Sequence, residues 1–345
     1  MKNKVFFIAI AAVVVLALAI GFGVFFMNNS SDYVAKVDGE KITVAEYKFF
    51  LANVKSSIEN AVGLGSGDAS SVDKFWEGKL GTMNAEDYAK EQALGKVQEF
   101  KIQLIKAKEE GVKLDQSDIS SVDTYIDTII KGNNGKENAE KAIKQDYGIT
   151  LKQLKGIYKD SKLVDKYIKT KEDAIKVTDQ DIKKYYDENM EVKDKTTTVW
   201  HILLSTKNSA GTALAGAELE KVKKNAEDIL SKVKSGVSFS SLVTQYTEDP
   251  GSKETGGQYT FNKGDMVKQF EDWSFKAKPG DTGIVKSDFG YHIMKKPTFE
   301  EVKASAKSGF IGKEYENMLE KLKKDKKFNI EKNDKQYNKI TIKSI

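Results

Sequence analysis

The sequence predicts an α+β fold, in which a small antiparallel sheet with helices lies beside a mainly helical lobe and an N-terminal transmembrane helix. Residues 5–27 are a long apolar run without a charge. Residues 33–194 carry repeated helix start signals, and residues 195–297 alternate strand-like with helical apolar spacing. We expect the helices of this last region to lie on one side of its sheet, which is an α+β arrangement.

The composition limits the classes of function. A chain of 345 residues is long for a single hydrophobic core, so two folded regions are expected. Charged residues make up 31% of it, and 56 basic against 51 acidic residues without blocks of like charge argue against nucleic-acid binding. Every basic residue is lysine, which argues against a phosphoserine or phosphothreonine reader because bidentate phosphate recognition relies on arginine. The absence of cysteine excludes disulfides, thiolate catalysis and a lipid anchor on cysteine.

The apolar run at residues 5–27 predicts a membrane span. With a rise of about 1.5 Å per residue, a run of this length crosses a hydrocarbon core of roughly 30 Å. Lys2 and Lys4 precede it, so we expect a single-pass protein of the cell membrane whose body lies outside the cytoplasm. A cleaved signal peptide is the alternative, although its Ala17-Leu18-Ala19 pattern lies inside the apolar run rather than in a polar stretch.

Residues 33–194 predict a helical lobe. It opens with two short strands about an Asp38-Gly39 turn. A helix that includes Leu94 ends at Gly111, and other helices start at capping boxes, in which a side chain bonds the backbone three residues on. The boxes are Thr43 with Glu46, Thr150 with Gln153, and Thr178 with Asp181.

Two segments that border this lobe are less regular. Residues 63–81 are rich in Gly, Ser and Asp, so we interpret them as a loop whose Phe75 and Trp76 either pack on the lobe or contact a client polypeptide. Residues 299–324 predict a lysine-rich helix, and residues 339–345 predict a strand. The apolar residues of this strand favour docking on the lobe over a loose tail; they are Ile340, Ile342 and Ile345.

Two further predicted strands, at residues 197–205 and 289–295, each carry one of the two histidines of the chain. His201 alternates with apolar neighbours, and His292 lies at the middle of its strand. If the strands are neighbours, both imidazoles face one cleft, where histidine is readily tuned as a donor or an acceptor near neutral pH. Between them the pattern is two helices, a strand, a helix and a strand. By themselves, two such histidines would more often be core residues with satisfied hydrogen bonds.

The order and spacing of residues 197–296 resemble the parvulin-type peptidyl-prolyl isomerases. The resemblance rests on His201-Ile202-Leu203, Glu248-Asp249-Pro250-Gly251-Ser252, Gly256-Gly257, Lys263-Gly264-Asp265-Met266, Phe270, Phe275, Pro279-Gly280 and Phe289-Gly290-Tyr291-His292-Ile293. It implies catalysis of rotation about X-Pro bonds without a metal or a cofactor. That rotation has a barrier of about 18–20 kcal/mol, and a catalyst must favour the twisted amide over both planar forms.

The resemblance assigns roles by position. The catalytic positions are His201, His292, the hydroxyl residue Ser287 that hydrogen-bonds the histidine pair, and Asp249 near the rotating carbonyl. The substrate-binding positions are Met266, Phe270 and Phe289. Where the family usually has Gly-Gly-Asp-Leu-Gly, this chain has Gly256-Gly257-Gln258-Tyr259-Thr260-Phe261. Gln258 or Tyr259 therefore takes the place of the leucine on the pocket wall, and the activity is expected to be weak or altered.

A looser resemblance links the helical region to the chaperone lobe of extracytoplasmic foldases of the PrsA and SurA kind. It rests on Val37-Asp38-Gly39-Glu40-Lys41-Ile42-Thr43 and Val177-Thr178-Asp179-Gln180-Asp181-Ile182. In those foldases the segment after the isomerase returns to complete the lobe. The implied organisation is an anchor and linker at 1–32, a lobe at 33–194 completed by 298–345, and an isomerase domain inserted at 195–297.

Two functions follow from these observations. The first is an isomerase and foldase that acts at the membrane on unfolded exported polypeptides with X-Pro segments. The alternative is a holding chaperone without catalysis, in which the parvulin-like domain is a binding or structural module. A metal-dependent or hydrolytic enzyme has little support, because the two histidines lack a carboxylate at metal-ligand spacing and no nucleophile motif is present. The oligomeric state stays open, and a homodimer through the helical lobe is one alternative.

Overall fold

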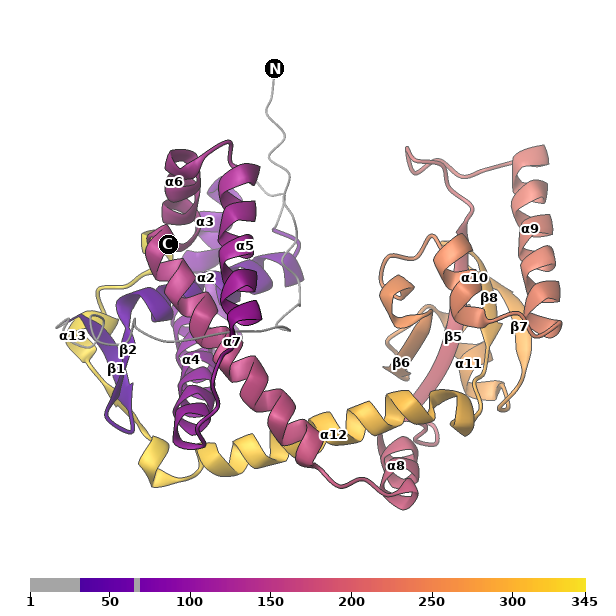
Figure 1. Cartoon of the computed structure of the whole chain (residues 1–345). Coiled ribbons are helices and arrows are strands. Elements are labelled where there is room, and N and C mark those ends of the chain that lie inside the picture. The colour runs from indigo at the N-terminus through magenta and orange to yellow at the C-terminus, as the bar shows by residue number, and fades with distance from the viewer. Residues whose placement is uncertain (1–31, 65–68) are drawn as a thin grey trace. The chain divides into compact units, whose positions relative to one another are not determined.

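A computed structural model describes residues 32–64 and 69–345 (Figure 1). The predicted span at residues 5–27 lies outside these residues, and among them no helix is both long and apolar enough to cross a membrane. The chain divides into two compact units. One consists of the described residues up to Ile175 together with Tyr315–Ile345, and the other of Lys176–Glu314. Both combine helices with small antiparallel sheets, so the predicted mixed α+β class is confirmed.

The first unit contains a three-stranded antiparallel sheet in the order β2-β1-β9. β1 (Tyr33–Val37) and β2 (Glu40–Thr43) form the predicted hairpin, and its turn places Asp38 and Gly39 at positive φ values of 50° and 75°. β9 (Ile330–Lys332) pairs with the other edge of β1. The C-terminal segment therefore belongs to the same unit as the first strands.

Helices complete the first unit, and two of them begin at predicted capping boxes. α2 (Val44–Ala61) starts at the box of Thr43 with Glu46, and α7 (Leu151–Ala174) at the box of Thr150 with Gln153. Between them lie α4 (Ala85–Glu109), α5 (Gln116–Gly132) and α6 (Lys136–Tyr147). Apolar residues of α2, α4 and the sheet share one core, which the C-terminal Phe328 and Tyr337 also enter.

The structure corrects the predicted loop at residues 63–81. Residues 69–77 form the helix α3 (Ala69–Glu77), followed by the short strands β3 (Lys79–Leu80) and β4 (Met83–Asn84). Trp76 is buried, and its indole N–H donates to Glu59 at 2.8 Å. Val72, Phe75 and Trp76 are spaced three and four residues apart and pack on the lobe core. The Ser- and Asp-rich composition concealed this amphipathic helix, because spacing rather than polarity decides which side of a helix is buried.

The predicted strand at residues 339–345 is also wrong. The 3₁₀ turn η4 (Ile342–Ser344) lies there instead, and it follows the short helix α13 (Asp334–Tyr337). Ile340 and Ile342 are buried in the lobe core, so the predicted docking is confirmed. The free edge of β1 is already occupied by β9, which leaves these isoleucines to pack as side chains without strand pairing.

The second unit contains a four-stranded antiparallel sheet in the order β6-β5-β8-β7. It begins with α8 (Asp179–Tyr185), which starts at the predicted box of Thr178 with Asp181, and the π-helical turn η1 (Tyr186–Met190). The predicted succession of elements follows. It consists of β5 (Thr196–Ser205), α9 (Gly216–Lys234), α10 (Phe239–Tyr246), the 3₁₀ turn η2 (Lys253–Thr255), β6 (Gln258–Asn262), α11 (Lys268–Lys276), β7 (Thr282–Lys286) and β8 (Gly290–Lys295). The helix α12 (Phe299–Lys323) begins in this unit.

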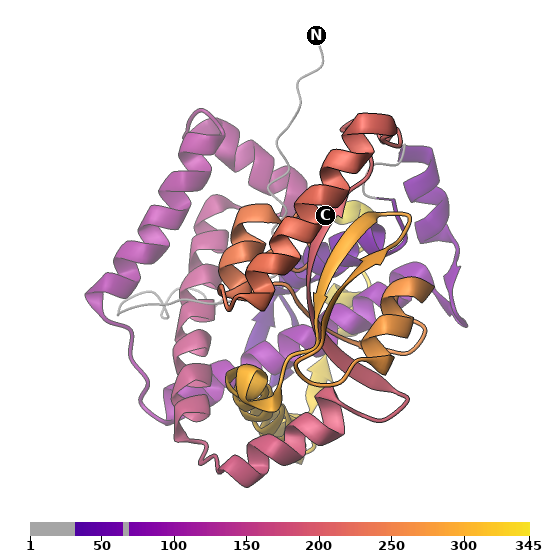
Figure 2. The same ribbon diagram turned by 90° about the vertical axis from the view of Figure 1, so that its right-hand side faces the viewer.

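Helices cover both faces of this sheet, contrary to the prediction that they lie on one side (Figure 2). α9 and α10 pack on the face that carries Ile202 and Ile293, whereas α11 packs on the face that carries Val199 and Met294. β5 is a central strand buried on both faces, so its sequence is an almost continuous apolar run in which alternation is hard to detect. The face covered by α11 is the one that carries both histidines.

Candidate functional site

The two histidines lie side by side on neighbouring strands. In the antiparallel pairing of β5 with β8, His201 is opposite Met294 and His292 is opposite Leu203. Both imidazoles therefore point to one face of the sheet, as predicted. Their Nδ1 atoms are 3.3 Å apart, and the two side chains are only 3% and 5% exposed.

Asp249 and Ser252, from the loop after α10, contact the outer nitrogen of His201. His201 Nε2 lies 3.0 Å from Asp249 Oδ2 and 3.0 Å from Ser252 Oγ, and Ser252 Oγ donates to Asp249 Oδ2 at 2.5 Å. At the other end of the pair, Ser287 Oγ lies 2.7 Å from His292 Nε2. The predicted group of His201, Asp249, His292 and Ser287 is thus joined into one hydrogen-bonded chain.

With both imidazoles neutral, as their burial favours, the hydrogen-bond partners are satisfied by one arrangement of protons. The single hydroxyl hydrogen of Ser252 goes to Asp249, and an ionised carboxylate only accepts, so His201 Nε2 must carry a proton. In a neutral imidazole Nδ1 of His201 is then unprotonated and accepts from the Nδ1–H of His292. His292 Nε2 in turn accepts from the hydroxyl of Ser287. In this arrangement every ring nitrogen of the neutral pair has a partner.

Burial sets the ionisation of the pair. It lowers the pKa of His201, an effect that the neighbouring Asp249 carboxylate partly opposes. Burial, followed by repulsion from His201, lowers the pKa of His292 to about 4. For Asp249, burial acts to raise the pKa, but hydrogen bonds from Ser252, Tyr259 and the Gly251 amide outweigh it and hold the pKa below its ordinary value. At neutral pH the site is therefore a carboxylate beside two uncharged imidazoles.

We expect the stability of this unit to decline as the pH falls from about 6.5 toward 4. In that window an unfolded chain protonates its histidines, near the ordinary pKa of 6.5, while the folded His292 stays neutral down to its pKa of about 4. Above pH 6.5 the free energy of unfolding has its full value. By pH 4, the difference in pKa of His292 alone lowers it by about 3 kcal/mol. Because the chain has just two histidines, their C2–H proton resonances report both pKa values directly. Two resonances that titrate near 6.5 in the folded chain, as they should in urea, would contradict this assignment.

Apolar rings surround the histidine pair. Phe270 of α11 is buried and meets both imidazoles edge-on, with ring centroids 5.2 Å from each. Tyr259 of β6 stacks on His201 with centroids 5.1 Å apart and planes inclined by 27°. Met266 is partly buried in the same cluster. Phe289, in the turn between β7 and β8, is 55% exposed, and its backbone N–H donates to Ser287 Oγ at 3.1 Å.

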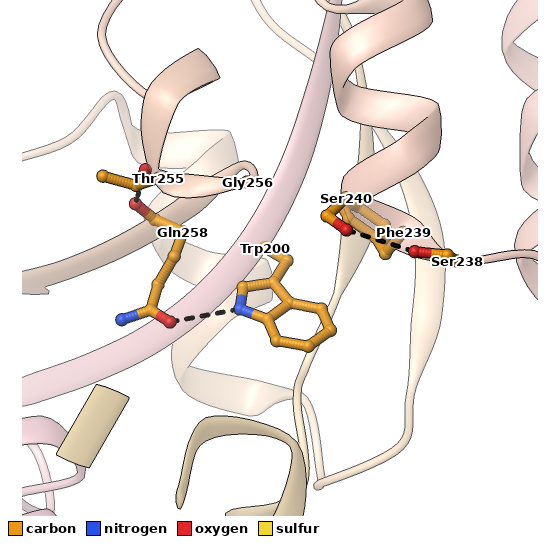
Figure 3. A pocket seen from close by; sticks show the side chains of 7 residues that line it. All are labelled: Trp200, Ser238, Phe239, Ser240, Thr255, Gly256 and Gln258. Atoms are coloured by element: carbon orange, nitrogen blue, oxygen red, sulfur yellow. Dashed lines mark hydrogen bonds between the residues drawn. The ribbon is translucent and has the colours of Figure 1, made fainter. Parts of the chain in front are cut away.

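The structure separates the two residues that were predicted as alternatives for the pocket wall. Tyr259 lies on the histidine face, but Gln258 lies on the opposite face, where it accepts from the indole of Trp200 at 3.3 Å and donates to Ser305 at 2.9 Å. There it lines a cavity of about 240 Å³ with Trp200 and Phe239 (Figure 3). Adjacent residues of a strand point to opposite faces, so Gln258 as a wall of the histidine site is wrong.

Sequence reasoning missed Ser252 as a member of the site, together with the hydroxyl contact of Tyr259. Ser252 is fully buried, and Tyr259 donates to Asp249 Oδ2 at 2.9 Å. A signal for Ser252 was present, because a serine three residues after an acid can return a hydrogen bond to it within one turn. The Tyr259 contact had no such signal, because ten residues separate it from Asp249 and only the path of β6 brings them together.

Comparisons with known proteins identify the family of the chain. Residues 180–297 match the PPIC-type PPIase domain family, and residues 1–77 match the SurA-like N-terminal domain family. The chain is 30% identical over 287 residues to a foldase protein PrsA of Caldanaerobacter subterraneus subsp. tengcongensis, a match that covers 81% of this chain and 79% of the relative. It is 34% identical over 214 residues to a foldase protein PrsA of Geobacillus sp., covering 58% and 65%. The crystal structure of PrsA from Bacillus subtilis is 26% identical, with a TM-score of 0.39 over 70% of this chain and 86% of that chain.

Proposed function

The chain belongs to the PrsA foldase family, and we propose that its parvulin-type domain isomerises X-Pro bonds of exported polypeptides outside the cytoplasm. The observation that supports this most directly is the ionised Asp249 held beside a ring-walled site. Three side chains supply the apolar walls that a proline ring requires, namely Tyr259, Met266 and Phe270. The exposed Phe289 adds an apolar rim that the residue before or after the proline can contact.

The charge of Asp249 supplies a reason for catalysis. In a planar amide, resonance places negative charge on the carbonyl oxygen, and twisting the bond removes resonance and part of that charge. A carboxylate near that oxygen therefore repels the planar forms more than the twisted one. Interactions that favour the transition state over the ground state in this way raise the rate.

The histidine pair acts as the floor of the site and holds Asp249 in place. Both imidazole N–H protons take part in the series of hydrogen bonds that links Ser287 to Asp249. Neither imidazole therefore has a free proton to transfer. Rotation about a C–N bond requires no proton transfer. The pair instead provides a buried, uncharged surface against which the proline ring and Phe270 pack.

The organisation around this domain is part of the proposal. Residues 33–194 together with 298–345 form a chaperone lobe that holds clients, residues 195–297 form the isomerase domain, and residues 1–32 anchor the chain in the membrane. Of the lobe, residues 176–194 and 298–314 pack in the same compact unit as residues 195–297. The pairing of β9 with β1 and the burial of Ile340 and Ile342 support a lobe made of two separate segments. Each anchored chain can act alone or as a homodimer through the lobe.

The decisive experiment is a proline-isomerisation assay on a short X-Pro peptide, with the full chain in detergent. We expect the rate of isomerisation to exceed the spontaneous rate in proportion to protein concentration. A chain that prevents aggregation of an unfolded client but leaves the spontaneous rate unchanged would establish the holding chaperone instead.

A deletion tests the division of labour between the two functions. A variant in which a short linker replaces residues 195–297 should still suppress client aggregation and should lose all isomerase activity. The flanking residues can still pack on each other, because Ile182, Tyr186 and Met190 form a cluster with Val302 and Ala306. Circular dichroism and a light-scattering assay measure both properties. An unfolded product, or a folded one without any effect on aggregation, would contradict the two-segment chaperone lobe.

A further inference from the structure

Among the residues that the structure describes, Tyr259 is the one side chain of the site that both stacks on His201 and donates a hydrogen bond to Asp249. β6 places it opposite Val199 of β5, on the histidine face. Its ring stacks on His201, and its hydroxyl reaches Asp249 Oδ2. The ring therefore belongs to the apolar wall, whereas the hydroxyl belongs to the network of the acid.

The two carboxylate oxygens of Asp249 are used unequally. Oδ2 is within hydrogen-bond distance of Tyr259 at 2.9 Å, Ser252 at 2.5 Å and His201 at 3.0 Å. Within the described residues Oδ1 accepts only from the Gly251 amide, at 3.1 Å. A carboxylate oxygen offers about two lone-pair directions, so Oδ2 is saturated while Oδ1 keeps one open. The carboxylate is thereby held in one orientation.

The Tyr259 hydroxyl itself has little freedom. A Cβ atom added to Gly251 would lie 2.4 Å from it, so the loop backbone passes directly against this oxygen. The ring is fixed on its other side by the stacking on His201. Contact with Asp249 is therefore built into the path of the loop and of β6, not made by a mobile surface side chain.

We propose that Tyr259 is the positioning residue for Asp249 and also the third wall of the proline pocket, with the hydroxyl acting on kcat and the ring on KM. This inference rests on the proposed isomerase function and deepens it. The titratable groups that face Asp249 are His201 from β5, His292 from β8 and Tyr259 from β6. Without the hydroxyl, Oδ2 loses a donor, so the carboxylate turns more freely and its charged form is less favoured.

Two substitutions at this position separate the roles. Tyr259→Phe retains the ring, so we expect KM to stay within about twofold while kcat falls about five- to tenfold, as the loss of one hydrogen bond to a charged group predicts. In a plot of kcat against pH, the fall in activity on the acid side should also begin at a pH higher by about half to one unit than in the wild type. Tyr259→Leu should show the same fall in kcat with KM raised as well. Tyr246→Phe is the matched control, because that hydroxyl bonds Lys232 and its ring packs on the other face of the sheet.

A second measurement keeps this inference distinct from the proposed function. With aspartate labelled by ¹³C at the carboxyl carbon, the resonance missing from Asp249→Asn identifies Asp249 in the full chain, and its titration needs no catalysis. A higher Asp249 pKa in Tyr259→Phe than in the wild type and in Tyr246→Phe supports the inference. If the wild type is active, but Tyr259→Phe changes neither this titration nor kcat, the positioning role is overturned while the isomerase function stands. If the wild type is inactive, the function fails, and the titration alone decides whether Tyr259 holds the carboxylate.

Discussion

Replacing Asp249 by alanine is expected to lower kcat/KM for proline isomerisation by about 10- to 100-fold, which corresponds to roughly 1.4–2.7 kcal/mol of lost transition-state stabilisation. The reason is the loss of the ionised carboxylate that lies beside the ring-walled pocket. Its side chain is 16% exposed, so a substrate can approach it while water screens its charge only in part. A coupled peptide assay at pH 7 measures the effect.

Two further variants show whether charge causes this loss. Asp249→Asn keeps the shape and removes the charge, so we expect its activity to be close to that of Asp249→Ala. Glu254→Ala removes an exposed carboxylate of the same loop and should leave the rate unchanged. An asparagine variant as active as the wild type would show that shape, not charge, matters at this position. Circular dichroism of each variant verifies that the domain remains folded.

Substituting Gly257 by alanine is expected to reduce the free energy of unfolding of the second unit by about 3 kcal/mol or more. Gly257 has a φ of +84°, and a Cβ there would lie 2.5 Å from the carbonyl oxygen of His201 and 2.7 Å from Val243 Cγ2. The Gly257 carbonyl also accepts from the His201 amide at 2.8 Å, so the two backbones cannot move apart without breaking the bond. The substitution should therefore displace His201 and abolish catalysis as well.

Gly264→Ala provides the matched control. Its φ is +98°, but a Cβ there meets nothing within 4 Å, so only the backbone strain remains, at roughly 1–2 kcal/mol. Urea unfolding followed by tryptophan fluorescence compares the two variants. Equal losses would mean that the close approach to His201 contributes nothing beyond the positive φ.

Local features of the sequence were sufficient for much of the fold. The capping boxes at Thr43, Thr150 and Thr178 are formed as predicted, because each depends on contacts within one helical turn. The placement of one histidine in each of two strands predicted a shared face for His201 and His292 if the strands were neighbours, and the pairing of β5 with β8 confirms it. Spacing also predicted the order of elements in the second unit.

Features that depend on which segments become neighbours were decided only by the tertiary structure. The helix α3 is stabilised by burying Phe75 and Trp76 against a core that its own composition does not reveal. The last residues form turns because β9 already occupies the edge of β1. The covering of both sheet faces depends on where α9, α10 and α11 pack, which no single strand determines.

The site shows the same division. The resemblance that the residue types and their order carry implied that a histidine pair, an acid and apolar rings would meet, and this much was available from the sequence by itself. Whether Gln258 or Tyr259 faces the pair depended on the register of β6 against β5, where a shift by one residue exchanges the two faces. Only the tertiary structure fixed that register. It also brought the Tyr259 hydroxyl and the buried Ser252 into contact with Asp249, because these hydrogen bonds require the backbone positions that packing provides.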